Sequence, residues 1–163
     1  MATYLLDANC FIEAQNRFYS IDFCPGYWDW LKQQNKLGNL FSIDKIRAEV
    51  IKKEDNAANW AKQIGKGFFL PVDEDATEKL KDINIWAANA GYKEQLVRKF
   101  QNSNDQYLVA YGLAHGHTVV THETLNANQR NAIKIPAACL GCKIHCMTIF
   151  EVLRATGAKL VLG

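Results

Sequence analysis

Residues 104–123 read NDQYLVAYGLAHGHTVVTHE, and this stretch decides the fold. After Asp105, apolar residues recur at the spacing of a helix, and Gly116 is the type of residue at which helices commonly end. The β-branched run that begins TVVTHE (118–123) is typical of a strand buried on both faces of a parallel sheet. The stretch therefore predicts a helix over 105–115 that feeds directly into a strand over 118–123.

Segments on both sides of this stretch repeat the alternation of strand and helix. Strands are predicted at TYLLDANC (3–10), at LFSI (40–43) and at the start of KIHCMTIFEVL (143–153), which then runs into a final helix. Other helices are predicted from Trp28 to a stop at Gly38 after a break at Pro25 and Gly26, from an N-cap at Asp44 to 55, over 56–68 and over 73–91. Pro136 is interpreted as part of a loop. This order predicts an α/β fold, a three-layer sandwich around a central, mostly parallel sheet.

The bulk composition restricts the class of protein. A chain of 163 residues that is 48% hydrophobic suits a single domain over 1–163 with a substantial core. No apolar run approaches the roughly 18 residues of a membrane span, and the start lacks a secretory signal, so we expect a soluble, cytoplasmic protein with no membrane partner. A net charge of +2 neither demands nor excludes a nucleic-acid partner. Five cysteines in such a chain indicate free thiols rather than disulfides.

Acidic residues occur at the places that meet at one edge of a parallel sheet. Asp7 ends the first predicted strand, and Glu123 ends the strand over 118–123, with Thr121 on the same side as Glu123. Asp105 opens a crossover helix, and helix beginnings lie at the same edge as the carboxyl ends of strands. Glu49, in the helix that follows Asp44, has a side chain long enough to reach inward. Each acid alone also fits a turn, a helix start or a solvated surface; their convergence favours a site.

Several carboxylates in one place repel each other, so they bind either protons or a cation. Oxygen-only ligands select hard divalent ions such as Mg²⁺ or Mn²⁺, which are commonly shared with phosphate oxygens. Such an ion lowers the pKa of a bound water and offsets charge on a leaving oxygen, which is the chemistry of phosphodiester hydrolysis. The acids therefore predict a Mg²⁺- or Mn²⁺-dependent hydrolase.

With these residues in place, the chain resembles the PIN-domain nucleases, including the VapC-like toxins of bacterial type II toxin–antitoxin pairs. The resemblance rests on LLDAN near the start, IRAEVIK in mid-chain and above all residues 104–123. It implies a metal-dependent endoribonuclease that cleaves RNA and is inhibited by a cognate antitoxin protein, with a possible homodimer. It also implies metal-binding, catalytic roles for Asp7, Glu49, Asp105 and Glu123, which would be oriented by Asn9 and Thr121. The last acid is usually Asp in the family, so Glu123 reaches one methylene further.

Two other functions are open at this point. A PIN-like module that only binds RNA or protein is favoured by Glu at position 123 instead of Asp. An aspartate-nucleophile phosphatase also places an acid after its first strand, but it needs a second Asp where this chain has Asn9.

Two further clusters have alternative interpretations. Cys139, Cys142, His145 and Cys146 are close enough in sequence to suggest a zinc or iron–sulfur site, whereas small buried thiols are the commoner case. Tyr27, Trp28 and Trp30 could stack on RNA bases, whereas core packing or a contact between two copies near 27–31 is the commoner use of such rings. We also expect basic side chains within reach of the acids, among them Lys45, Lys99 and Arg130.

Overall fold

The computed structural model describes residues 3–126, 128 and 130–162. Its strands lie in the order β3-β2-β1-β4-β5, and every neighbouring pair is parallel. The strands are β1 (Tyr4–Leu6), β2 (Leu40–Ile43), β3 (Phe69–Leu70), β4 (Thr118–Thr121) and β5 (Cys146–Thr148). Because β1 is central and β4 is its neighbour, the chain places its first strand and its most strongly β-branched strand side by side.

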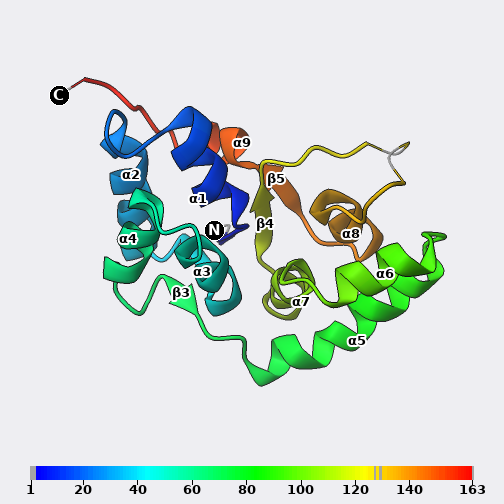
Figure 1. Cartoon of the computed structure of the whole chain (residues 1–163). Helices are drawn as coiled ribbons and strands as arrows, with labels where there is room; N and C mark the ends of the chain where they lie inside the picture. Colours follow the sequence, from blue (N-terminus) through cyan, green and yellow to red (C-terminus); the bar gives the residue numbers. More distant parts are fainter. Residues whose placement is uncertain (1–2, 127, 129, 163) are drawn as a thin grey trace.

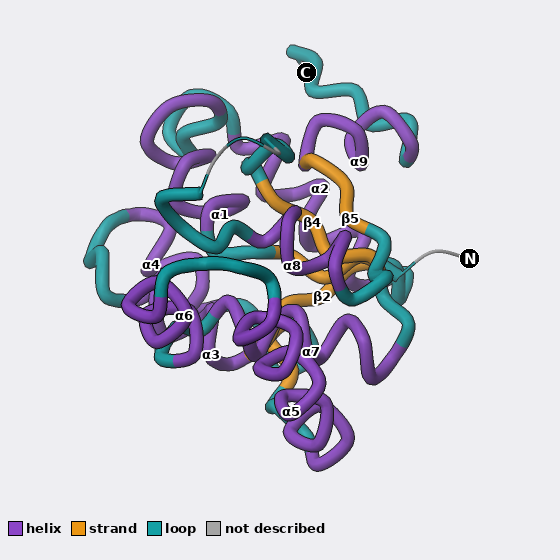
Figure 2. The backbone as a smooth tube through the Cα atoms, turned by 90° about the vertical axis from the view of Figure 1, so that its right-hand side faces the viewer, coloured by secondary structure: helices purple, strands orange, loops and turns teal. Residues whose placement is uncertain are grey.

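Helices cover the sheet on both sides, which confirms the predicted three-layer α/β sandwich. They are α1 (Asn9–Glu13), the π-helix η1 (Ala14–Phe18), α2 (Pro25–Lys36), α3 (Asp44–Ile51), α4 (Asn56–Gln63), α5 (Glu74–Asn89), α6 (Glu94–Gln101), α7 (Asp105–His115), α8 (Ile135–Gly141) and α9 (Ile149–Ala155). Figure 1 shows β4 and β5 between the group α1–α4 and the group α5–α8. Figure 2, turned toward the second group, shows the strands behind these helices. No helix in the described ranges is both long and apolar enough to cross a lipid bilayer.

The aromatic side chains of α2 belong to the core. Tyr27, Trp28 and Trp30 are at most 6% exposed, so the interpretation as an RNA-stacking surface is wrong, and these rings do not form a contact between two copies. Their polar tips are satisfied inside the chain, as buried Tyr and Trp require: Tyr27 Oη donates to the Cys10 carbonyl at 2.7 Å and Trp28 Nε1 to that of Tyr19 at 2.7 Å.

The strands that lead to the acids are shorter than the sequence predicts. The first ends at Leu6 instead of residue 10, because the chain turns after Asp7 and the Cys10 amide donates to the Asp7 carbonyl at 3.1 Å. The strand predicted over 118–123 ends at Thr121, since its partner β5 ends at Thr148. The Thr148 hydroxyl accepts a hydrogen bond from the Glu151 amide and so begins α9. Glu123 therefore lies two residues beyond the strand.

Two prolines begin helices where the sequence analysis expected a break or a loop. Pro25 is the first residue of α2, and Pro136 lies in the first turn of α8. Proline suits this position because the first helical amides have no partner within the helix. Asp44 is likewise not the N-cap of α3 but its first residue, where an acid interacts favourably with the helix dipole.

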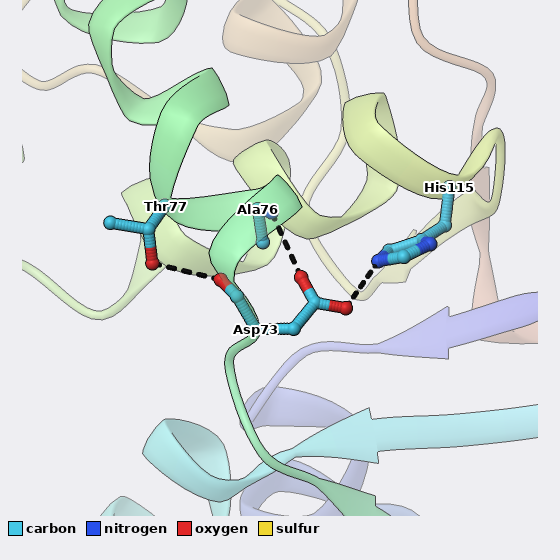
Figure 3. Close-up of polar contacts among 4 residues, drawn as sticks. All are labelled: Asp73, Ala76, Thr77 and His115. Carbon is cyan, nitrogen blue, oxygen red and sulfur yellow. Dashed lines mark hydrogen bonds and ion pairs between the residues drawn. The ribbon is translucent and has the colours of Figure 1, made fainter.

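Asp73 links the beginning of α5 to the end of α7 (Figure 3). Its carboxylate accepts a hydrogen bond from the Ala76 amide at 2.9 Å, and its Oδ2 atom lies 2.7 Å from His115 Nε2. Burial raises the pKa of Asp73, but the contacts with the Ala76 amide and His115 lower it by more. The pKa of Asp73 is therefore below its usual value. This contact anchors the end of α7 opposite to Asp105, and Gly116 then ends the helix in the left-handed conformation with φ of 68°.

Candidate functional site

Asp7 is the most buried of the four predicted acids. It directly follows β1, is 2% exposed, and its amide donates to the Val120 carbonyl of β4 at 2.9 Å. Thr121 Oγ1 donates to Asp7 Oδ2 at 2.9 Å, so the neighbouring strand supplies a partner for the carboxyl group. Burial is the largest cause of a strongly raised pKa at Asp7, followed by the charges of Asp105 and Glu123, while the Thr121 hydroxyl lowers the pKa.

Asp105 is the first residue of α7, as the sequence predicts, and it lies near three other acids. Its pKa is raised to about 6, first by burial and then by the charges of Glu123 and Glu49. Because Asp105 also acts on Asp7, it connects acids that come from four separate parts of the chain. The structure therefore brings the predicted acids into one electrostatic cluster at the carboxyl edge of the sheet.

Glu49 approaches Asp105 because α3 is held against the beginning of α7. Asn104 Nδ2 donates to the Lys45 carbonyl at 3.3 Å, and the Lys45 ammonium lies 5.0 Å from the ring centre of Tyr107. Glu49 Oε2 is buried and has no hydrogen-bond partner within the described residues. A buried acceptor without a partner is costly, and such an atom commonly marks the place of a bound water or ion.

Both oxygens of the Glu123 carboxylate face a partner that follows it in the chain. Its Oε2 atom accepts a hydrogen bond from the Ile135 amide at 3.0 Å, and its Oε1 atom lies 3.8 Å from Lys134 Nζ. Its own amide donates to Thr121 Oγ1 at 3.1 Å. Thr121 thus bridges Asp7 and Glu123, while His122 turns away and stacks on Phe18.

The donor set of this cluster fits a hard divalent cation. Its potential ligands are all carboxylate oxygens, neighbouring acids raise the pKa of Asp7 and of Asp105 beyond the effect of burial, and Glu49 Oε2 has no partner within the described residues. Within the described residues, however, no group of three or more His, Cys, Asp or Glu side chains is already arranged to hold an ion. The acids affect one another's pKa, and side chains would have to move for three of them to coordinate one ion.

The remaining predicted residues lie as follows. Asn9 is half-buried and begins α1, two residues after Asp7. Arg130 is not at the acids: its guanidinium lies 4.0 Å from the ring centre of Tyr92 and donates to the Ala90 carbonyl at 2.8 Å. Lys134, whose ammonium lies 3.8 Å from Glu123 Oε1, was not predicted from the sequence to lie at the site. Reading Pro136 as the first turn of a helix would have placed Lys134 at that helix start.

Thr121→Val is expected to affect both stability and metal affinity. Valine keeps the shape of the side chain but removes the hydroxyl that donates to Asp7 and accepts from the Glu123 amide. A buried group left without its partner costs about 1–3 kcal/mol. Lost hydrogen bonds to metal ligands weaken metal binding by roughly 10- to 100-fold. Chemical denaturation measures the change in stability, and calorimetric titration with Mn²⁺ measures the change in affinity. Thr121→Ser keeps the hydroxyl and should restore both in large part. A Thr121→Val variant with wild-type stability and Mn²⁺ affinity would contradict the role given to the Thr121 hydroxyl.

A family model matches residues 4–160, and its description is a domain of unknown function, DUF4411. The chain belongs to the DUF4411 family. A search of curated proteins finds no match to this DUF4411 domain.

Three solved structures resemble the DUF4411 domain. FitAB bound to an IR36 DNA fragment gives a TM-score of 0.57 at 18% identity, over 90% of this chain and 94% of that one. FitAcB from Neisseria gonorrhoeae gives 0.54 at 18%, over 89% and 96%. VapBC2 from Rickettsia felis bound to a promoter DNA fragment gives 0.53 at 12%, over 90% and 98%. The DUF4411 domain therefore has the VapC-like PIN fold that the sequence predicts.

Proposed function

We propose that this protein is a metal-dependent endoribonuclease that hydrolyses RNA phosphodiester bonds and acts as the toxin of a toxin–antitoxin pair. The observation that supports this most strongly is the position of Asp7 and Asp105, which come from distant parts of the chain. After burial, the charge of Asp105 raises the pKa of Asp7, and the charges of Glu123 and Glu49 raise the pKa of Asp105. A bound cation offsets such repulsion between carboxylates.

In this proposal Asp7, Glu49 and Asp105 are the principal ligands of Mg²⁺ or Mn²⁺, with Glu123 as the fourth acid. When bound, the ion lowers the pKa of a water and offsets charge on the leaving oxygen. The chain's own contribution is positional. Thr121 holds the Asp7 carboxylate and the Glu123 backbone in register, and burial of Asp7 keeps bulk water from that side of the site.

The toxin role is supported by the likeness to FitAB and VapBC2, both of which were solved as complexes on DNA. By analogy, this chain would bind a cognate antitoxin, and the pair would bind DNA of its own promoter. The alternative is a PIN-like module that binds RNA or protein without cleavage. It is favoured by one observation, the engagement of the Glu123 carboxylate with the Ile135 amide.

The purified chain tests this proposal. With Mn²⁺ we expect saturable heat of binding in the millimolar range or tighter, and cleavage of a mixed RNA substrate that stops when EDTA is added. Calcium serves as a matched control, because it is also a hard cation but accepts more ligands in looser geometry than Mg²⁺ does. Binding of RNA without cleavage at any Mn²⁺ or Mg²⁺ concentration would favour the non-catalytic module, and absence of Mn²⁺ binding would exclude the proposed site.

A further inference from the structure

A small pocket adjoins two of the four acids, between α6, the start of α7 and the segment that leads into α8. Its volume is ≈ 150 Å³. Among the residues that line it are Lys99, Phe100, Ser103, Asp105, Glu123 and Lys134. The pocket thus places two lysines, Lys99 and Lys134, beside two of the acids.

Lys134 lines this pocket, and its contact with Glu123 leaves it able to bind a ligand. The Lys134 ammonium lies 3.8 Å from Glu123 Oε1, which is longer than the 2.7–3.2 Å of a typical hydrogen bond. The contact is therefore a Coulombic one, and within the described residues the ammonium has no closer partner, so its N–H donors are available to a ligand. The Lys134 side chain is also 40% exposed, so a ligand can reach it.

The position of Lys134 follows from Glu123. One oxygen of Glu123 accepts from the Ile135 amide, which fixes the start of α8, and the other faces the lysine one residue earlier. Lys99, in the last turn of α6, brings a second positive charge to the same pocket. Phe100 and Ile133 form an apolar wall, being 4% and 7% exposed, and a wall of low polarity strengthens charge interactions beside it.

An RNA strand that approaches four carboxylates is repelled by them, because each of its phosphates is also negative. A cation at the edge of the cluster would offset this repulsion for one phosphate. We propose that Lys134, assisted by Lys99, forms a phosphate-binding subsite for the RNA strand beside the acidic cluster, with Glu123 as the residue that positions Lys134. This inference rests on the proposed function, because it takes RNA as the substrate.

The test measures RNA binding apart from cleavage. A labelled single-stranded oligonucleotide is titrated with the full chain in EDTA, which withholds divalent ions, at several salt concentrations. Each lysine–phosphate contact in a single strand contributes about 0.7 to the slope of log affinity against log salt. We expect Lys134→Gln to reduce the slope by about 0.7 and to weaken binding to all sequences alike, whereas Lys134→Arg should retain the slope.

Lys79 provides the matched control. Its ammonium also lies 3.8 Å from a carboxylate, that of Asp82, its side chain is 44% exposed, and it does not line the pocket. Lys79→Gln should leave the slope unchanged. In a Glu123→Gln background, Lys134→Gln should change the slope by less than it does in the wild type, because the lysine is then no longer held in place.

The outcomes separate this inference from the nuclease function. An unchanged slope in a folded Lys134→Gln variant overturns the subsite, even where the wild type cleaves RNA with Mn²⁺. A reduced slope in that variant supports the subsite, even where no cleavage is found and the nuclease proposal fails. A wild type that binds no RNA in EDTA, or a Lys79→Gln variant with the same loss as Lys134→Gln, also overturns the subsite.

Discussion

Asp105→Asn is expected to lower the rate of Mn²⁺-dependent RNA cleavage by at least about 100-fold, since loss of mere hydrogen-bond partners of metal ligands already costs roughly 10- to 100-fold. Asp105 is central to the cluster because its charge acts on Asp7 and it receives the charges of Glu49 and Glu123. Asparagine keeps the size of the side chain and one oxygen acceptor but removes the negative charge that attracts a divalent cation. Initial cleavage rates at saturating Mn²⁺, and over a series of Mn²⁺ concentrations, measure the loss.

The control for this substitution is Asp29→Asn. Asp29 is an exposed residue of α2, so its variant changes the net charge of the protein by the same amount without touching the cluster. We expect wild-type rates from it. Circular dichroism must show that both variants are folded. Equal cleavage by the wild type and a folded Asp105→Asn variant would remove the catalytic role of the cluster.

The central part of the fold could be predicted because local and long-range preferences agree there. In residues 104–123, helical spacing, a glycine stop and a β-branched run all indicate the helix and strand that the structure has as α7 and β4. The edge rule for parallel sheets then placed Asp7 and Asp105 together, because it depends only on the direction of the chain and not on exact boundaries.

Two errors concern prolines, which fit two local structures. Pro136 and Pro25 fit a loop as well as a first helical turn, and only the packing of α8 and α2 decides between them.

The strand β3, just Phe69–Leu70, is too short for any alternation to be seen in the sequence. The helix α6, also missed, has only a few apolar residues in one face, with Val97 and Phe100 buried.

The partners of the Glu123 carboxylate, the Ile135 amide and Lys134, could not be predicted from the sequence. The Ile135 amide, which donates to this carboxylate, comes 12 residues later in the chain, so this contact depends on tertiary structure and not on a local sequence pattern. The sequence identified the acid but not its partners. The position of Lys134 was missed for the same reason, although it directly precedes α8, two residues before Pro136.

The raised pKa of Asp105 predicts a specific pH dependence of stability in metal-free protein. A carboxyl group with a pKa near 3.9 in the unfolded chain and of about 6 in the folded one binds more protons in the folded state between these values. The stability that it contributes is therefore fully present at low pH and is lost as the pH rises through about 6. Asn cannot ionise, so the Asp105→Asn variant does not suffer this loss.

The difference in unfolding free energy between Asp105→Asn and wild type should thus grow in favour of the variant from pH 4 to pH 8, by at most about 3 kcal/mol at 1.36 kcal/mol per pKa unit. Urea denaturation in EDTA at both pH values measures it, with Asp29→Asn as a control whose difference stays flat. Adding Mn²⁺ at about 100 times its Kd should stabilise only the wild type, by about 2.7 kcal/mol, and so close most of the gap. A difference that stays constant across this pH range, or that shrinks before any metal is added, would mean that burial and the neighbouring acids do not raise the pKa of Asp105, and would contradict the arrangement of the acids on which the cation site depends.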